Sequence, residues 1–377
     1  MHVVIDQNIP GLAQLLAPVV SVTALPGRDI TRSDLLEADA LVCRSQTFVT
    51  EALLRDTPVR FVATATSGTD HIDRRWLSGA SIPFADAHGS NAASVVDYVV
   101  AAMALHGLES RRDLRELRAG VVGAGAVGSL LIERLRATGI STLVSDPPLA
   151  EGASLKDQPI EVLGGVDLLS LHVPLVREGR HPTAGLIDAS FLRAMPRGAL
   201  LVNAARGGVV DEDAWVTHLQ GQGGHDAVVD TWDGEPALNG ALLRHSRIAT
   251  PHIAGHSLDA KVDGTRMVAR ALASTFDLNL DLNALDGMTL PAAPAPLKVA
   301  LESVEDVYIT ILALYDLRDD DRGLRNALAL GEALPGAFDR LRGTYPVRRD
   351  LGRLAVQATG SGELIAFLRG LGVPTVD

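Results

Sequence analysis

A glycine-rich segment, Gly123-Ala124-Gly125-Ala126-Val127-Gly128, constrains the fold more than any other feature of this sequence. It follows a short apolar segment, Val121-Val122, and opens a stretch of helical spacing that begins near Val127. Glycines at these three positions allow a tight turn, the close approach of a pyrophosphate, and close packing of the helix on the strand. Free N–H groups at a helix start also favour an anion. The segment therefore predicts a dinucleotide site formed by Gly123, Gly125, Ala126, Val127 and Gly128.

An acidic residue follows the next apolar segment, at the distance expected for a ribose ligand. Asp146 comes directly after Leu143 to Ser145, about 20 residues beyond the glycine segment. A carboxylate there accepts a hydrogen bond from the ribose 2′-hydroxyl and repels a 2′-phosphate, so we expect NAD rather than NADP as the cofactor. Two alternatives stay open: a chance cluster in a chain with 36 glycines, and an Asp146 that only caps the turn before Pro147.

Short apolar segments alternate with helical patterns along most of the chain. Helical spacing is found from Asn91 to about Glu109 and from Ala260 to about Phe276. Strands are expected at residues 3–5, 40–43, 61–65, 121–122, 143–144, 168–171, 200–203, 228–229 and 248–249. This alternation predicts an α/β protein with doubly wound parallel sheets, whose ligands bind at the carboxyl ends of the strands.

The chain is too long for one ordinary core, since domains usually have about 50 to 250 residues. We expect a flavodoxin-like substrate domain at residues 1–90 and 256–285, and a Rossmann NAD domain at residues 91–255. Residues 286–377 are expected to form a small α+β domain. Within it, residues 307–312 read as a strand and residues 323–333 as a helix.

Charge and cysteine content exclude several classes of partner and site. Lys and Arg total 34 against 46 Asp and Glu, and the formal net charge of -12 disfavours nucleic acid and anionic lipid as partners. The longest apolar stretch, Val95 to Leu108, contains Asp97 and is shorter than the ~20 residues that span a bilayer. Cys43 is the only cysteine, which excludes an internal disulfide and a thiolate metal cluster. With no secretion signal at the start of the chain, these features predict a cytoplasmic protein without a membrane span.

Three polar side chains follow predicted strands, in turns marked by glycine or proline. Arg206 precedes Gly207-Gly208, Glu235 precedes Pro236, and His252 follows Pro251. A guanidinium matches a carboxylate bidentately, whereas an imidazole can take a proton and a carboxylate can orient the imidazole. We therefore predict oxidation of a 2-hydroxy acid, in which Arg206 binds the carboxylate, His252 accepts the hydroxyl proton and Glu235 holds the ring.

These motifs together resemble the D-isomer-specific 2-hydroxyacid dehydrogenases. The glycine segment with Asp146 and the stretches 203–211, 230–236 and 251–255 occur in the family's order, and the resemblance spans roughly residues 40 to 270. It implies further NAD contacts at Asp146, Val173, Ala204, Asp230 and Gly255. Four stretches, residues 64–73, 91–100, 338–342 and 345–349, resemble one subfamily, which acts on a small phosphorylated hydroxy acid and dimerises through an added C-terminal domain. A homodimer is therefore implied.

The subfamily resemblance also implies substrate contacts at Ser45 and Thr66. A substrate phosphate requires a local cation in a negatively charged protein, and Arg44, beside Ser45, is our first candidate. Arg348 and Arg349 of a partner subunit are the second candidate, with an ordinary solvated face as their alternative. His256 stands where the subfamily usually has tyrosine, so another D-2-hydroxyacid, of the 3-phosphoglycerate or glyoxylate/hydroxypyruvate type, stays open as the substrate.

Two other classes of function were weighed. His252 and His256 are four residues apart and could share a helix face as zinc ligands, but Pro251 and Gly255 argue against a regular helix there. We therefore predict no metal. A dinucleotide-binding fold can also serve as a non-catalytic NAD-sensing regulator, and the three polar residues favour chemistry over this alternative.

Overall fold

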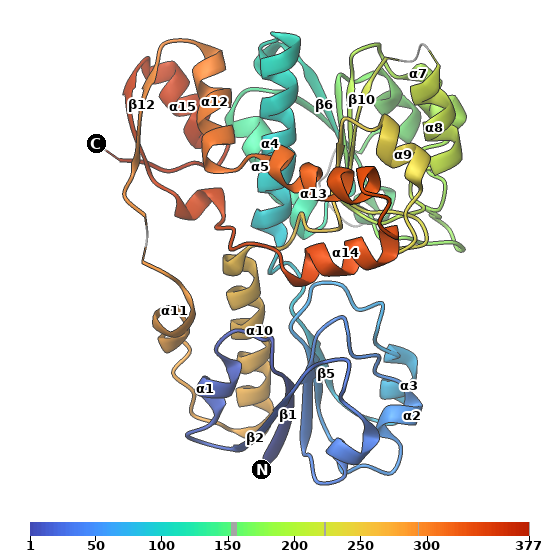
Figure 1. Ribbon diagram of the computed structural model, residues 1–377, viewed down its shortest axis with the longest axis vertical. Coiled ribbons are helices and arrows are strands. Elements are labelled where there is room, and N and C mark those ends of the chain that lie inside the picture. The colour runs from blue at the N-terminus through green and yellow to red at the C-terminus, as the bar shows by residue number, and fades with distance from the viewer. Residues whose placement is uncertain (152–156, 222–223, 293, 377) are drawn as a thin grey trace. The chain divides into compact units, whose positions relative to one another are not determined.

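The computed structural model describes residues 1–151, 157–221, 224–292 and 294–376. The chain is an α/β protein built on parallel sheets (Figure 1), which confirms the expected fold class. It divides into two compact units, Met1–Asn91 with His256–Ala293, and Ala92–Gly255 with Pro294–Asp377. The C-terminal residues thus belong to the same compact unit as the predicted NAD domain.

The first unit contains a five-stranded parallel sheet in the order β2-β1-β3-β4-β5, the flavodoxin-like order. Its strands are β1 (His2–Asp6), β2 (Ser21–Leu25), β3 (Ala40–Cys43), β4 (Val62–Thr64) and β5 (Phe84–Asp86). Its helices are α1 (Leu12–Leu16), α2 (Glu51–Leu54), α3 (Arg74–Gly79), α10 (Leu258–Phe276) and α11 (Ala284–Thr289), with a 3-10 turn at Arg32–Leu35. The sequence did not reveal β2 and β5, because their residues are half-buried or exposed and form no continuous apolar run.

The second unit contains a six-stranded parallel sheet in the order β11-β10-β9-β8-β6-β7. Its strands are β6 (Arg118–Val122), β7 (Ser141–Ser145), β8 (Leu168–Leu171), β9 (Leu200–Asn203), β10 (Asp226–Val229) and β11 (Ile248–Ala249). Its helices are α4 (Ala92–Ser110), α5 (Ala126–Ala137), α6 (Pro147–Ala150), α7 (Ala189–Ala194), α8 (Glu212–Gln220) and α9 (Gly240–His245), with 3-10 turns at Leu114–Glu116 and Ile160–Gly165. Because β7 and β8 lie on opposite sides of β6, the strand order reverses at β6, where open α/β sheets bind their ligands.

Helix α4 is long and apolar enough to cross a membrane by length and composition alone. However, 83% of its apolar stretch is buried inside the fold, among the residues of the largest apolar core. It is therefore a core helix, as expected from the polar residues that interrupt it.

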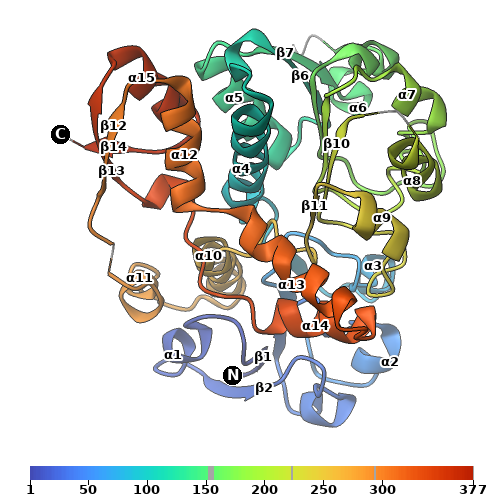
Figure 2. The same ribbon diagram turned by 45° about the horizontal axis from the view of Figure 1, so that its top comes forward.

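The C-terminal residues form a three-stranded parallel sheet, β12-β13-β14, and four helices. These are β12 (Leu297–Leu301), α12 (Val304–Leu314), α13 (Leu317–Ala329), α14 (Leu334–Gly343), β13 (Val356–Gly360), α15 (Gly362–Gly370) and β14 (Thr375–Val376), with a 3-10 turn at Leu351–Arg353. The strand predicted at residues 307–312 is wrong, because these residues lie within α12. A capping box of Ser303 and Asp306 starts this helix, and α12 packs against α4 (Figures 1 and 2), so tertiary burial outweighed β-branched composition.

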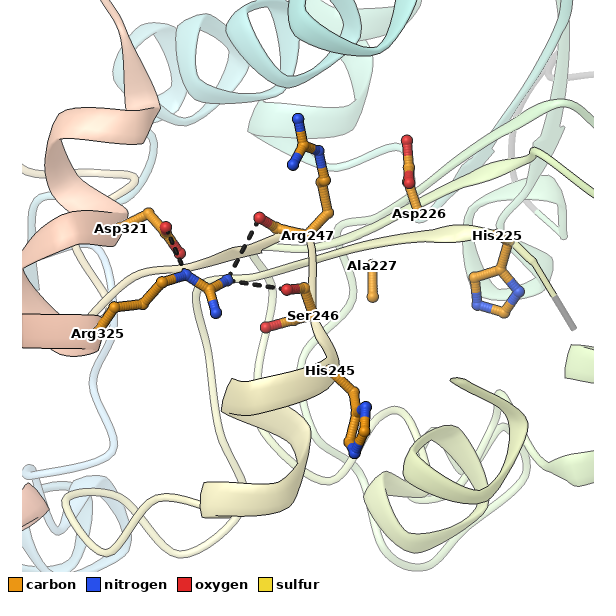
Figure 3. A pocket seen from close by; sticks show the side chains of 8 residues that line it. All are labelled: His225, Asp226, Ala227, His245, Ser246, Arg247, Asp321 and Arg325. Carbon is orange, nitrogen blue, oxygen red and sulfur yellow. Dashed lines mark hydrogen bonds and ion pairs between the residues drawn. The ribbon is translucent and has the colours of Figure 1, made fainter. Parts of the chain in front are cut away.

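Helix α13 covers the edge strand β11 (Figure 3). The Ala249 N–H, which has no strand neighbour on this side, donates to Asp321 Oδ1 at 2.8 Å. Arg325 Nε donates to Asp321 Oδ2 at 2.6 Å, and Arg325 Nη2 donates to the Ser246 carbonyl at 2.8 Å. An open sheet edge is thereby closed by polar side chains of the C-terminal segment.

Candidate active site

The three glycines of the loop after β6 serve three different purposes. Gly123 has φ +88°, which side-chain-bearing residues rarely adopt, and makes the tight turn. A Cβ at Gly128 would overlap the Gly123 carbonyl, so Gly128 allows α5 to pack closely on the loop. A Cβ at Gly125 would meet nothing within 4 Å, which leaves open space at the amino end of α5. The loop therefore fits a pyrophosphate against free backbone N–H groups.

Asp146 reaches this loop from the end of β7. Its Oδ2 accepts a hydrogen bond from the Ala124 N–H at 2.7 Å, and its Oδ1 accepts one from the Leu149 N–H at 3.0 Å. The capping role considered as an alternative is thus real, but the carboxylate also lies against the glycine loop. Both observations are compatible with a ribose ligand at this position.

The other residues predicted to contact NAD follow strands that end in register. Val122 of β6 pairs with Leu171 of β8, Leu171 with Asn203 of β9, and Asn203 with Val229 of β10. Val173, Ala204 and Asp230 follow these strands within two residues, and Gly255 follows shortly after β11. The structure therefore brings these backbone positions to the same edge of the sheet as Gly123, and they fit NAD.

Glu235 and His252 form a hydrogen-bonded pair in the turns after β10 and β11. His252 Nδ1 and Glu235 Oε2 are 2.8 Å apart, and Glu235 Oε1 accepts from the Trp232 N–H at 2.8 Å. The side chains of His252 and Glu235 are 33% and 23% exposed. The ring is therefore held at Nδ1 while part of it stays accessible.

Burial alone would raise the pKa of Glu235, but the neighbouring groups outweigh it. The charge and hydrogen bond of His252, the Trp232 N–H and the charge of Arg342 lower the pKa of Glu235 below its ordinary value. Glu235 is therefore a carboxylate at neutral pH and can accept a hydrogen bond from the Nδ1–H of His252.

Arg206 lies in the turn after β9, and its Nη1 donates to the Ala205 carbonyl at 2.8 Å. A Cβ at the next residue, Gly207, would collide with the backbone of Trp232 and Asp233. The absence of that Cβ lets the turn with Arg206 pack directly on the turn that leads to Glu235. All three predicted catalytic residues thus lie in adjoining turns of the second unit.

Asp230 organises the backbone around His252, a role that the sequence did not reveal. Its carboxylate accepts from the Ile253 N–H at 2.8 Å, from the Ala254 N–H at 3.0 Å and from Thr250 Oγ1 at 2.6 Å. The His252 N–H donates to the Asp230 carbonyl at 2.8 Å, while His252 itself has φ +54°. Asp230 is 1% exposed, so it is an internal anchor of this turn.

The predicted substrate residues Arg44, Ser45 and Thr66 belong to the first unit. Cys43 of β3 pairs with Thr64 of β4, which brings Ser45 and Thr66 to the carboxyl ends of neighbouring parallel strands. Thr66 Oγ1 donates to the Gly68 carbonyl at 2.9 Å, and Ser45 is exposed. No ion-pair partner of Arg44 is found among residues 1–151, 157–221, 224–292 and 294–376. His256 also belongs to this unit and is half-buried.

Arg348 does not occupy the solvated or substrate-facing position considered for it. It is only 8% exposed, its guanidinium lies 4.5 Å from the centre of the Tyr315 ring, and it donates to the Ala254 carbonyl. Its charge also lies near Asp320, whose pKa is raised by burial. Arg348 is therefore an internal cation of its own chain.

Over the part of the chain that the structure describes, no group of three His, Cys, Asp or Glu side chains is placed to hold a metal ion. A separate hollow of about 350 Å³ lies beside β10 and β11 (Figure 3). Its two arginines are already engaged, Arg325 with Asp321 and Arg247 with Glu109. The hollow is lined by neither Arg206, Glu235 nor His252, so the chemistry lies elsewhere.

Comparison with known proteins identifies the family. Residues 99–254 match the NAD binding domain of the D-isomer specific 2-hydroxyacid dehydrogenases, and residues 297–372 match a domain of unknown function, DUF3410. An erythronate-4-phosphate dehydrogenase of Pseudomonas syringae pv. syringae is 41% identical, with 100% of both chains covered. The chain belongs to the erythronate-4-phosphate dehydrogenase family. It is thus an NAD-dependent dehydrogenase, as predicted.

Further relatives agree with this assignment. An Escherichia coli O7:K1 erythronate-4-phosphate dehydrogenase is 40% identical over 94% of each chain. Among solved structures, a D-lactate dehydrogenase of Aquifex aeolicus, complexed with NAD and lactic acid, has a TM-score of 0.60 at 22% identity, covering 78% of this chain and 100% of that one. A 3-phosphoglycerate dehydrogenase of Entamoeba histolytica has a TM-score of 0.61 at 20% identity, covering 75% and 97%. At these identities the structural likeness shows the fold.

Proposed function

We propose that this member of the erythronate-4-phosphate dehydrogenase family oxidises 4-phospho-D-erythronate with NAD. The product would be (R)-3-hydroxy-2-oxo-4-phosphooxybutanoate, an intermediate of pyridoxal 5′-phosphate biosynthesis. The observation that carries the proposal is the 2.8 Å contact between His252 Nδ1 and Glu235 Oε2, in a chain 41% identical over its full length to a relative of that name.

The geometry of the pair assigns the proton acceptor. Because Nδ1 is engaged with Glu235, the free lone pair of a neutral imidazole is on Nε2. Nε2 of His252 takes the proton of the substrate 2-hydroxyl as the hydride leaves C2, and the oxygen becomes the carbonyl of the product. Bound NAD supplies the hydride acceptor. The imidazolium that forms is stabilised by the Glu235 carboxylate.

Arg206 is proposed to bind the substrate carboxylate. Its planar guanidinium can donate two parallel hydrogen bonds, which also fixes C2 relative to the imidazole. Lys could not reproduce this geometry, because an ammonium is a point charge.

Arg44, Ser45 and Thr66 are proposed to bind the rest of the substrate, with Arg44 at the phosphate. A net charge of -12 repels a phosphorylated hydroxy acid, so a local cation is required. Arg44 is half-buried and follows β3 directly, which limits the freedom of its side chain. His256 is proposed to influence substrate preference, because an imidazole offers a smaller ring and a different donor than tyrosine.

A cytoplasmic homodimer is proposed as the working form. The described part of the C-terminal segment exposes four large apolar side chains, Ile309, Leu330, Val347 and Val376, at 53%, 77%, 72% and 42%. We propose these side chains as part of an association surface, and the symmetric dimer is the commonest oligomer. Light scattering after size exclusion would show a dimer, whereas a monomer would contradict this part of the proposal.

A substrate panel tests the function. NADH formation would be followed at 340 nm, with roughly equal concentrations of 4-phospho-D-erythronate, 3-phosphoglycerate, glycerate and D-lactate. The expected result is the highest kcat/KM for 4-phospho-D-erythronate. A higher value for another hydroxy acid would reassign the substrate. NAD binding without turnover of any of them would favour the NAD-sensing alternative.

A further inference from the structure

The last turn of α14, in the C-terminal segment, reaches the turn that contains His252. Arg342 Nη1 donates to the His252 carbonyl oxygen at 2.9 Å. The same guanidinium lies 5.3 Å from the centre of the Phe338 ring, one turn earlier on α14. Phe338 is 4% exposed and belongs to an apolar core of the second unit. The arginine is therefore held by a buried aromatic ring on one side and by the His252 backbone on the other.

The His252 backbone needs such support. Its φ of +54° is in the left-handed region, which is unfavourable for a residue other than glycine and persists only where the surroundings hold it. Asp230 restrains the amide side of the turn through the N–H groups of residues 252–254. Arg342 restrains the carbonyl of the histidine itself. One side chain, Asp230, thus binds the N–H groups of this turn, and another, Arg342, binds its carbonyl.

The charge of Arg342 also acts on the partner of the imidazole. Arg342 lies close enough to Glu235 to contribute to lowering the pKa of that carboxyl. A cation here favours the ionised carboxylate, which is the form that accepts a hydrogen bond from Nδ1–H. The arginine therefore affects both members of the pair, one through a hydrogen bond and the other through its field.

A second anchor from the same segment lies just upstream. Asp321 of α13 accepts the Ala249 N–H, three residues before His252, and Arg325 holds Asp321 in place (Figure 3). Helices α13 and α14 pack together, so the two anchors belong to one helical pair. The strand before His252 and the His252 carbonyl are both bound to the C-terminal segment.

We propose that Arg342 is a positioning residue for the His252–Glu235 pair, through which the C-terminal segment orders the active site. This rests on the proposed function, in which His252 is the base. Arg342 itself is not assigned to substrate or cofactor. It sets the direction of the imidazole and favours the ionised form of its carboxylate partner.

The experiment compares Arg342→Gln with Arg340→Gln in the full-length protein. Arg340 is two residues away on α14, but it pairs with Glu332 on the exposed surface. We expect Arg342→Gln to lower kcat about 10-fold to 100-fold, with the Kd for NAD unchanged, as for a small displacement of a reacting group. Arg340→Gln should retain the kcat of the parent. A ¹³C NMR titration of the Glu235 carboxyl should give a higher pKa in Arg342→Gln only.

Arg342→Lys is the conservative variant, and also covers the case in which Arg342→Gln does not fold. It keeps the charge but not the planar stack on Phe338, so Glu235 should titrate as in the parent while kcat is partly restored. Equal kcat and equal Glu235 titration in the Arg342 and Arg340 variants would overturn the inference. If the parent oxidises no hydroxy acid, the proposed function fails. The Glu235 titration then decides the Arg342 inference by itself.

Discussion

The carboxyl ends of the two parallel sheets bear side chains of very different character. In the first unit, the positions after β3 and β4 carry an exposed Ser45, a half-buried Arg44 and the hydroxyl of Thr66. In the second unit, the turns after β10 and β11 carry Asp230, Glu235 and His252. Glu235 binds the ring of His252, and Asp230 binds the backbone N–H groups of residues 252–254, with hydrogen bonds of 2.8 to 3.0 Å. Ser45 of the first sheet end is thus exposed, whereas the groups of the second are hydrogen-bonded to each other.

The difference follows from what each end is proposed to do. A group that transfers a proton must be held at a defined angle before the substrate arrives, so its partners are built into the fold. A group that recognises a phosphate gains from remaining available to the ligand. Substitutions at the carboxyl end of the sheet in the second unit should therefore reduce turnover. Substitutions at the carboxyl end of the sheet in the first unit should weaken substrate binding.

The largest effect is expected at His252. His252→Asn removes the proton acceptor, and general-base assistance typically contributes about 10² to 10⁴ in rate. We expect kcat to fall by about that factor, while NAD affinity by fluorescence titration stays nearly unchanged. His245→Asn, on an exposed helix end of the same unit, is the matched control. Near-normal turnover of His252→Asn would remove the contrast between the two sheet ends.

Arg44→Ala should have the next largest effect, and of a different kind. Loss of a charge-assisted hydrogen bond of about 1.5 to 3 kcal/mol corresponds to a rise in KM for 4-phospho-D-erythronate of roughly 10-fold to 150-fold. The kcat at saturating substrate should change little. Arg55→Ala, at the exposed C-cap of α2, serves as the control. An unchanged KM for Arg44→Ala would discard this residue as the phosphate ligand.

Asp146→Asn should produce a smaller change, in the cofactor. The carboxylate becomes a neutral amide, so we expect NAD to bind about 10-fold more weakly and the preference for NAD over NADP to shrink. Because Asp146 also caps α6, Asp188→Asn at the N-terminus of α7 controls for loss of a cap. Isothermal titration with NAD and with NADP would measure both affinities. If Asp146→Asn preferred NAD over NADP as strongly as the parent does, the assignment of Asp146 to the ribose would be wrong.

The smallest effect concerns stability and Glu212, in the second unit. Burial raises the pKa of Glu212 to about 7, against the opposing hydrogen bond from the Asp233 N–H. Since the folded pKa exceeds the ordinary value of 4.5, the folded state binds this proton more tightly than the unfolded chain does. The contribution of protonated Glu212 to stability is fully present below pH 4.5 and is lost as the pH rises through the folded pKa of about 7.

Calorimetry of Glu212→Gln therefore sharpens the contrast between buried and exposed groups. The Tm of the variant should decline less than that of the parent as the pH rises from about 4.5 to 7. Glu161→Gln, at an exposed position, should follow the parent. A parallel pH dependence in Glu212→Gln and the parent would contradict the burial of this carboxyl.

Much of this arrangement could be predicted from local sequence. Buried parallel strands such as β8 and β9 were recognisable because both of their faces are covered, which requires an unbroken apolar run. The half-buried β2 and β5 lack that run, and the apolar α12 resembled a strand because β-branched residues suit either environment once they are buried. Glycine, proline and the polar residues beside them marked the turns that contain Arg206, Glu235 and His252.

The supporting contacts were beyond such reasoning. Arg342 is one of many arginines, and nothing near it in the sequence connects it with a histidine 90 residues earlier. Arg348 resembled a surface cation until folding placed it against Tyr315. Asp230 was expected beside NAD, and its function as the anchor of residues 252–254 depends on the pairing of β10 with β11.

The sequence by itself determined the fold class and the glycine loop for NAD, and it predicted which groups react. Each of these depends on backbone freedom, periodicity or side-chain chemistry, which are properties of a few neighbouring residues. Only the tertiary structure decided which distant groups hold the backbone of His252, Asp230 at its amide and Arg342 at its carbonyl. It also brought the predicted partner Glu235 to 2.8 Å from the ring. Hydrogen bonds and charges act over a few ångströms in space, so partners far apart in the chain become visible only when it is folded.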